Sequence, residues 1–172
     1  MKKILLMVLV LTAVLLVPGC GLYNSQLNLP SYIEKIAIPV FANSTAEYEI
    51  PQYLTQQTIN EFMGNGKLQI TDETSADAVL KGEVTNYLNT PIDFDANQVP
   101  RQYRIIIHMT LYFFDNQAQK IIWTDKKVWE ETTYYVPNNI GMPAEDQNSA
   151  RKRVLDQLAK SILNRVLFGW TK

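Results

Sequence analysis

The sequence has few of the residues that form disulfides, metal sites and catalytic centres. Its 172 residues include one cysteine and one histidine. A lone cysteine excludes an intramolecular disulfide, and one histidine with scattered carboxylates fits no metal-ligand pattern. His108 lies in an apolar stretch without a neighbouring nucleophile, and no Gly-x-Ser-x-Gly motif occurs. A structural or surface histidine is therefore favoured over an enzymatic one.

An excess of positive charge is also absent. Sixteen basic residues face 17 acidic ones, giving a formal net charge of -1. Binding to nucleic acid requires a basic surface, so we expect no nucleic-acid partner. The composition is otherwise that of a globular protein, and the length predicts one domain.

The first nineteen residues differ from the rest. A basic start, Met1-Lys2-Lys3, precedes an apolar run from Ile4 to Val17. This run is too short to cross a hydrocarbon core of about 30 Å, and the pattern is typical of an export signal. We therefore assign residues 1–19 to a lipoprotein signal peptide, 20–31 to a lipidated Cys and tether, and 32–172 to a single α/β sandwich domain.

The cysteine lies at the end of this run. Val17-Pro18-Gly19-Cys20 resembles a bacterial lipobox, which implies an S-diacylglycerol and an N-acyl chain on Cys20 and no other cofactor. Several acyl chains anchor a protein firmly. Gly21 follows, not the Asp of an inner-membrane retention signal, so we expect the outer membrane. The alternative is a buried structural cysteine beside an ordinary cleavage site.

Hydrophobic periodicity predicts strands and helices along the rest of the chain. A helix between the first two main strands implies a crossover and a parallel pair, and hairpins follow it. The predicted fold is α+β, a two-layer sandwich with a mixed four-stranded sheet and two helices packed on one face. The predicted strands are 33–41, 78–88, 104–114 and 121–131, with a possible short strand at 68–71; the predicted helices are 50–63 and a long one from 144 onward.

Local details accompany this assignment. Alternation places Leu80, Val84 and Leu88 on one side of their strand. Residues 91–101 are expected to form a polar connection, and residues 115–118 a hairpin turn. Lys126 next to Lys127 marks either a bulge or an exposed strand end.

Several segments together resemble the LptE family of lipopolysaccharide-assembly lipoproteins. They span essentially the whole mature chain in the family's order, and the first is the most specific of them. They read "CGLYNSQLNLPSYIEKIAIPVFANST", "ADAVLKGEVTNYL", "YRIIIHMTLYFFD" with "IIWTDKKVWEE", and "ARKRVLDQLAKSILNRVL".

The resemblance implies a two-layer α/β domain in the lumen of an outer-membrane β-barrel, the LptD translocon. There it plugs the barrel, helps it to assemble and binds lipopolysaccharide during insertion into the outer leaflet. The protein would be lipid-anchored, at the periplasmic face or in the barrel lumen. The family's lipid-binding basic positions align with 93–98 and 142–144, where this chain has no Lys or Arg.

Two groups of residues are candidate binding sites. If the hairpin closes around Asn116, residues whose numbers sum to about 230 face each other, which gathers a cationic patch for lipid A phosphates. A solvated sheet edge is the alternative. A second group, of aromatic residues, suits contact with a barrel wall. The cations are Arg101, Arg104, Lys126 and Lys127; the aromatics are Tyr112, Phe114, Trp129 and Tyr134.

Other motifs have less specific interpretations. Asp93 and Asp95 lack the spacing of a Ca2+ loop and indicate a solvated turn. The basic run 151–153 points in three directions on a helix and indicates a solvated face or an acidic partner rather than a phosphate site. The segment "KIAIPVFANST" also resembles lipoproteins that activate cell-wall synthases or assemble secretion channels, so this alternative function stays open.

Overall fold

The computed structural model describes residues 29–137 and 141–169. Two helices and six strands make up this part of the chain. In chain order they are β1 (Lys35–Ala37), β2 (Ala42–Asn43), α2 (Ile50–Asn65), β3 (Gln69–Ile70), β4 (Ala78–Phe94), β5 (Pro100–Asp115), β6 (Lys120–Tyr135) and α3 (Gln147–Phe168).

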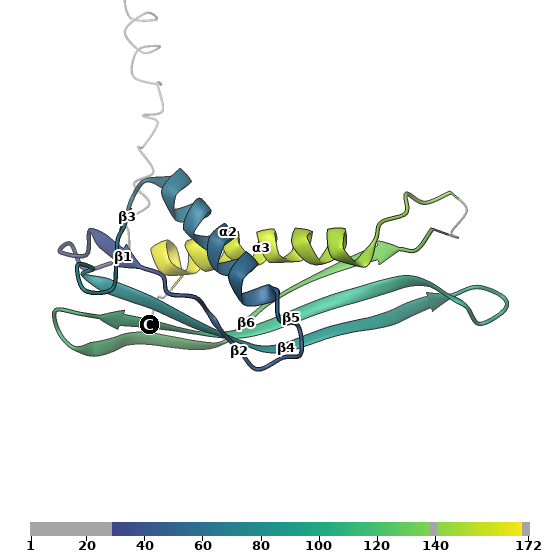
Figure 1. Ribbon diagram of the computed structural model, residues 1–172, viewed down its shortest axis with the longest axis horizontal. Helices are drawn as coiled ribbons and strands as arrows, with labels where there is room; N and C mark the ends of the chain where they lie inside the picture. The colour runs from purple at the N-terminus through teal and green to yellow at the C-terminus, as the bar shows by residue number, and fades with distance from the viewer. Residues whose placement is uncertain (1–28, 138–140, 170–172) are drawn as a thin grey trace, which may run out of the picture.

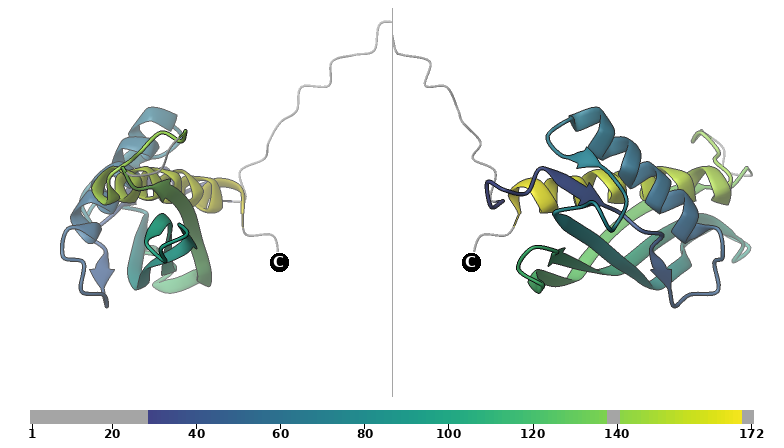
Figure 2. Two further views of the ribbon diagram at one scale, coloured as in Figure 1. Left: turned by 90° about the vertical axis from the view of Figure 1, so that its right-hand side faces the viewer. Right: turned by 60° about the vertical axis from the view of Figure 1, so that its left-hand side comes forward.

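The strands form one mixed sheet. Its order is β3-β1-β4-β5-β6, and β2 pairs with β4 beside β1. The pairs β1–β3, β1–β4 and β2–β4 are parallel, whereas β4–β5 and β5–β6 are antiparallel. Both helices lie on one side of the sheet, and no helix of residues 29–137 or 141–169 covers the other side (Figures 1 and 2). The α+β fold is therefore confirmed, as is the parallel pairing of the first two main strands.

The number of strands was predicted wrongly: there are six, not four. The segment 33–41 was expected to be one strand, but β1 ends at Ala37 and β2 begins at Ala42. Pro39 lies between them and has no N–H to donate to a strand ladder. The short segment after α2 adds β3, which pairs with β1.

The helix ends follow local rules. Pro51 lies in the first turn of α2, and Gly66 ends the helix in the left-handed region at φ 70°, which suits glycine. Asp146 is the N-cap of α3, and its side chain accepts the N–H groups of Asn148 and Ser149. That arrangement satisfies two of the donors a helix start leaves free.

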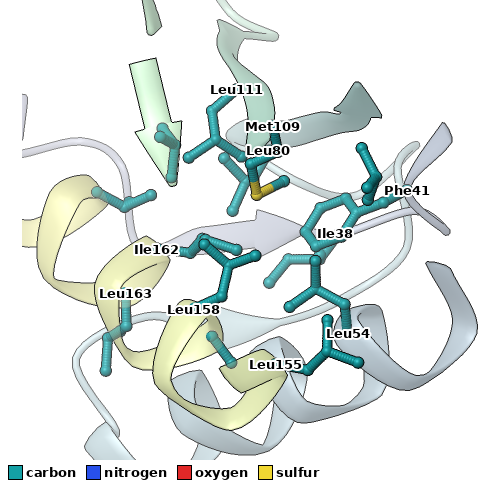
Figure 3. Packing of buried hydrophobic residues seen from close by; sticks show 14 of the residues in the cluster. Ile38, Phe41, Leu54, Leu80, Met109, Leu111, Leu155, Leu158, Ile162 and Leu163 are labelled. Carbon is teal, nitrogen blue, oxygen red and sulfur yellow. The ribbon is translucent and has the colours of Figure 1, made fainter. Parts of the chain in front are cut away.

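The core lies between the helices and the sheet (Figure 3). Leu158 and Ile162 of α3 are fully buried, as are Leu54 of α2 and Leu80 of β4. They belong to one continuous cluster with alternate residues of β5. Burial of apolar surface at about 25 cal/mol per Å² is the main force that joins the two layers.

The two central strands are longer than predicted. The polar connection expected at 91–101 is instead the end of a continuous hairpin, in which Pro91 pairs with Tyr103 and Phe94 with Pro100. Asp95 closes the turn by accepting the N–H groups of Asn97 and Val99. Pairing with the neighbouring strand overrides the low strand propensity of the Asp, Asn and Pro residues.

A bulge changes which side chains β4 presents. Val84 pairs with Met109 and Asn86 with His108, so Thr85 is an extra residue. One extra residue reverses the alternation of side chains. Leu88, predicted to share the buried side of Val84, is therefore 42% exposed on the face that the helices leave open.

Candidate functional site

The predicted lipid attachment point lies outside the described residues. Cys20, the signal peptide and all but the last three residues of the 20–31 tether precede residue 29, where the description begins. Among the described residues, no helix is long and apolar enough to cross a membrane.

The surface most suited to a partner is the open face of the sheet, by which we mean the side away from the helices. Leu88 lies opposite Ile106, and Asn86 lies opposite His108, which in turn lies opposite Trp129. The Trp129 ring is 52% exposed and its centroid is 6.4 Å from that of His108. Two neighbouring rows thus cross the three strands on this face: Leu88 and Ile106 are followed by Glu131, and Asn86 and His108 are followed by Trp129.

The predicted aromatic residues divide between the two faces. Tyr112 and Phe114 alternate with buried Leu111 and Phe113, which places them on the open face with Trp129. Phe114 packs there against a small buried cluster formed by Ala37, Ala76 and Val79. All three open-face aromatics contribute to this surface.

Tyr134 does not belong to the open face. It is 5% exposed and part of the main core. Its ring stacks on Tyr103 with centroids 5.4 Å apart, and its hydroxyl and the amide of Asn89 are hydrogen-bonded at 3.2 Å. The prediction of Tyr134 as a partner contact is therefore wrong for this structure, because strand alternation turns its side chain toward the helices.

The predicted cationic patch does not form as one unit. The hairpin turn lies at 116–119, and Asp115 pairs with Lys120. Two register shifts follow, so that Arg104 lies opposite Thr133 and far along the strand from Lys126 and Lys127. The numbers of facing residues in β5 and β6 add up to more than the predicted value of about 230. The turn lies further along the chain than expected, and each bulge adds a residue on one strand.

The two lysines mark a bulge, which was one of the two interpretations of the sequence. Met109 pairs with Val128 and Leu111 pairs with Asp125, so Lys126 and Lys127 together oppose one residue, Thr110. The carboxylate of Asp125 accepts the N–H of Lys127 at 2.8 Å, which stabilises the bulge. Both lysine side chains are exposed.

The two arginines are paired with carboxylates. Arg101 donates to Asp93, and this bond is the main cause of the lowered pKa of Asp93. Arg104 lies 3.9 Å from Glu131. Asp93 therefore belongs to an ion pair on the hairpin, and Asp95 closes its turn, as a turn interpretation of this segment requires.

The basic run at the start of α3 was expected to be solvated or to face an acidic partner. Arg151 instead donates to Glu47 at 2.7 Å and Glu49 at 3.1 Å, and Arg153 bonds Glu145 at 2.6 Å. The acidic groups that these arginines meet come from this same chain. These ion pairs hold the loops before α2 and α3 against the N-terminal end of α3.

The described residues, those of the open face among them, form no metal site. Within residues 29–137 and 141–169, no group of three His, Cys, Asp or Glu side chains is placed to hold a metal ion. His108 contacts Trp129, an apolar ring. Leu88 and Ile106 of this face were not predicted; only recognition of the bulge at Thr85 could have identified Leu88.

Comparison with known families and solved structures shows which proteins the chain is similar to. The LptE family model, described as lipopolysaccharide-assembly, matches residues 33–166. No curated protein matches the sequence. A minor lipoprotein from Acinetobacter baumannii has a similar structure, with TM-score 0.53, 17% identity and coverage of 80% of this chain and 92% of that chain. A PelC dodecamer from Paraburkholderia phytofirmans gives TM-score 0.51, 14% identity and coverage of 78% and 88%. At these identities the structural likeness concerns the fold alone.

Proposed function

The chain belongs to the LptE family of lipopolysaccharide-assembly proteins, and from this membership we propose that it is an outer-membrane lipoprotein that plugs the LptD β-barrel translocon. In this role it helps the barrel to assemble and aids insertion of lipopolysaccharide into the outer leaflet. The observation that carries the proposal is the family match across residues 33–166, which includes every described strand, all of α2 and most of α3.

The proposed anchor is Cys20, with its S-diacylglycerol and N-acyl chains. Each buried CH2 group contributes about 0.8 kcal/mol, so several chains hold a protein at a membrane. The proposed location is the periplasmic face of the outer membrane or the lumen of the barrel. Mass spectrometry of the mature N-terminus tests this assignment: the expected mass is that of a triacylated Cys20, and an unmodified thiol contradicts it.

The open face supports the plug role. Trp129, Leu88 and Ile106 lie in two neighbouring rows on the side of the sheet away from the helices, with polar residues such as His108 and Glu131 between them. Exposed apolar side chains gathered in this way are typical of partner-binding surfaces, because docking removes them from water. The proposed role is one of binding and assembly and requires no catalytic residue.

Lipopolysaccharide contact is proposed chiefly for Lys126 and Lys127. Their ammonium groups are exposed at the β6 bulge, and ammonium groups bind phosphates such as those of a lipid A head group. Arg101 and Arg104 are weaker candidates, because each lies next to a carboxylate.

Co-purification tests the plug role directly. The tagged full-length chain, expressed in its own host and extracted with detergent, should bring down a large outer-membrane barrel. A preparation that never contains a barrel contradicts the proposal. Recovery with a peptidoglycan synthase, or as a homo-oligomeric ring, would instead support the activator or secretion-channel alternative.

Two variants test whether the open face is the surface that contacts the barrel. Trp129→Ala should lower recovery of the barrel, because it removes the largest exposed ring of the open face. Tyr48→Ala is the matched control, since Tyr48 is 85% exposed in the loop before α2. Equal recovery with both variants would place the contact elsewhere than on the open face.

A further inference from the structure

The two edges of the sheet are protected very differently. The outer edge of β6 carries the Lys126–Lys127 bulge. Its Thr133 carbonyl accepts a hydrogen bond from Arg153 at 3.0 Å, and its Tyr135 carbonyl accepts the N–H of Glu145 at 2.9 Å. Charged side chains, bulges and covering segments are the usual means by which proteins prevent an edge strand from pairing.

The opposite edge is only partly covered. On this side of β4, β1 pairs at Ala78 and Val79, and β2 pairs at Glu83 and Val84. No described strand pairs beyond that point, and in the right-hand half of Figure 1 β4 itself is the margin of the sheet. The edge segment, which we define as Thr85–Pro91, is therefore open.

The edge segment is less protected than β6: it has the Thr85 bulge at its start and Pro91 at its end, but no charge within it. It reads TNYLNTP and contains no charged residue. Leu88 within it is 42% exposed, and Ile92 and Phe94 just beyond it are 38% and 42% exposed. An uncharged edge with exposed apolar side chains is a template for pairing with another strand.

The direction of the backbone groups can be worked out. The Val84 carbonyl faces this side, because it accepts the N–H of Ser44 at 2.9 Å. Across the bulge, the antiparallel alternation then turns Tyr87, Asn89 and Pro91 outward. Pro91 fits this orientation, since a strand proline directs its nitrogen away from the paired strand. Tyr87 and Asn89 thus present N–H and C=O groups that only an extended backbone complements in series.

We propose that the edge segment binds an extended, uncharged strand of a partner polypeptide, which adds to the sheet beside β2. The inference rests on the proposed function, because the partner is the barrel protein that the domain plugs. The added strand lies along the same edge of β4 as β2, next to it, and places an apolar side chain beside Leu88. Backbone pairing supplies affinity, and the absence of charge on the edge selects an uncharged strand.

A second copy of the chain fits the edge less well. In a symmetric antiparallel pair centred on Leu88, the residues near Asp93 of each copy would have to occupy the side of Glu83 and Val84 of the other copy. That side is already paired with β2, so the two strands could pair only over the short edge segment.

Two matched substitutions test the proposal. Thr90 of β4 and Thr133 of β6 are both exposed and both lie opposite Arg104. Thr90→Lys and Thr133→Lys therefore place the same charge beside the same arginine, on opposite edges. In full-length chains co-expressed with the barrel of the same genome, Thr90→Lys should reduce barrel recovery by about tenfold, whereas Thr133→Lys should leave it within about twofold.

A second measurement does not depend on recovery. A photo-crosslinking amino acid at position 90 should attach to the barrel, and the same amino acid at position 133 should attach markedly less. Equal loss with both lysine variants, or equal crosslinking, overturns the edge proposal while the proposed function stands. A crosslink from position 90 to a second copy also overturns it. Failure of the wild-type chain to capture any barrel overturns the proposed function and the edge proposal together.

Discussion

At the scale of single residues, carboxylates hold the turns of this domain. Asp72, which follows β3, accepts the backbone N–H groups of Thr74 and Ser75 and the hydroxyl of Thr74. The Thr74 and Ser75 hydrogen bonds lower the pKa of Asp72 from 3.8 to about 2, because they favour the charged carboxylate.

This lowered pKa predicts a pH dependence of stability. A carboxyl whose pKa is lower in the folded state stabilises the fold above its ordinary pKa and loses that effect as the pH falls through the folded value. Wild-type protein should therefore melt at a higher temperature than Asp72→Asn at about pH 5, and the difference should shrink between about pH 4 and pH 2. Thermal unfolding at a series of pH values measures it; a difference that is constant with pH contradicts the prediction.

The lysines of the β6 bulge provide a second residue-scale prediction. Replacing both Lys126 and Lys127 with Glu should weaken lipopolysaccharide binding several-fold without unfolding the domain, because both side chains are exposed and the change reverses their attraction for phosphates. A pull-down with lipopolysaccharide measures the effect. The control is the double change Lys35→Glu and Lys160→Glu, which alters the net charge equally. Unchanged binding by the bulge variant removes these lysines from the site.

At the scale of elements, α3 connects the helical layer to the sheet. It packs against α2, β5 and β6, and its buried residues repeat at helical spacing along one face. Its arginines also bond the loops at its N-terminal end. We therefore expect substitutions on its buried face to affect the entire domain rather than one end.

Leu158 tests this expectation. Its side chain is completely buried, so Leu158→Ala should lower the free energy of unfolding by about 2–5 kcal/mol, the usual cost of such a cavity. Gln157→Ala changes the exposed neighbour on the same helix and should have an effect below about 0.5 kcal/mol. Urea unfolding monitored by tryptophan fluorescence compares the two variants. A Leu158 variant as stable as the Gln157 variant would contradict the packing described here.

At the scale of the whole molecule, the first described residues and the β4–β5 turn lie at opposite ends (Figure 1). A strand of 17 residues such as β4 spans about 55 Å at the usual rise. The proposed anchor precedes the first of these ends by nine residues, counting from Cys20 to Leu29. Such a segment reaches at most about 30 Å, so the proposed membrane attachment lies near one end of the domain.

Anchoring and folding should be separable at this scale. Cys20→Ala removes the proposed acceptor for the acyl chains and leaves every described residue of the core unchanged. The variant should leave the membrane fraction and remain folded, with an unchanged melting temperature. Fractionation of cells and circular dichroism check the two expectations. A variant that stays in the outer membrane, or one that unfolds, would contradict the proposed role of Cys20 as an anchor only.

The elements whose residues have a strong period were predicted well. Both helices, the central strands and the parallel pairing of the first two main strands follow from apolar spacing and from the order of the elements. These signals are local, because each depends on residues within one or two turns or along one strand. The short strands β2 and β3 have too few residues for a period, and only pairing with β4 and β1 defines them.

The candidate surface could be predicted only in part. Trp129, Tyr112 and Phe114 were predicted as partner contacts and lie on the open face, whereas Tyr134, Arg104 and Leu88 were misplaced. For Arg104 and Leu88 the physical cause is that one extra residue at a bulge or turn reverses the faces or shifts the register of every residue beyond it. Tyr134 was misplaced because β6 continues to Tyr135, past the predicted end of the strand. A bulge depends on how two strands pair, so the sequence of either strand alone gives little indication of where it will form.

The sequence by itself determined the fold class, the family and the predicted lipid attachment point, because these depend on periodicity and on contiguous motifs. Only the tertiary structure decided which side chains share a surface. It paired Arg101 and Arg104 with carboxylates, buried Tyr134, exposed Leu88 and left one edge of β4 open. Those outcomes depend on contacts between strands that are distant along the chain, where register and pairing are set by the packing of the whole sheet against the helices.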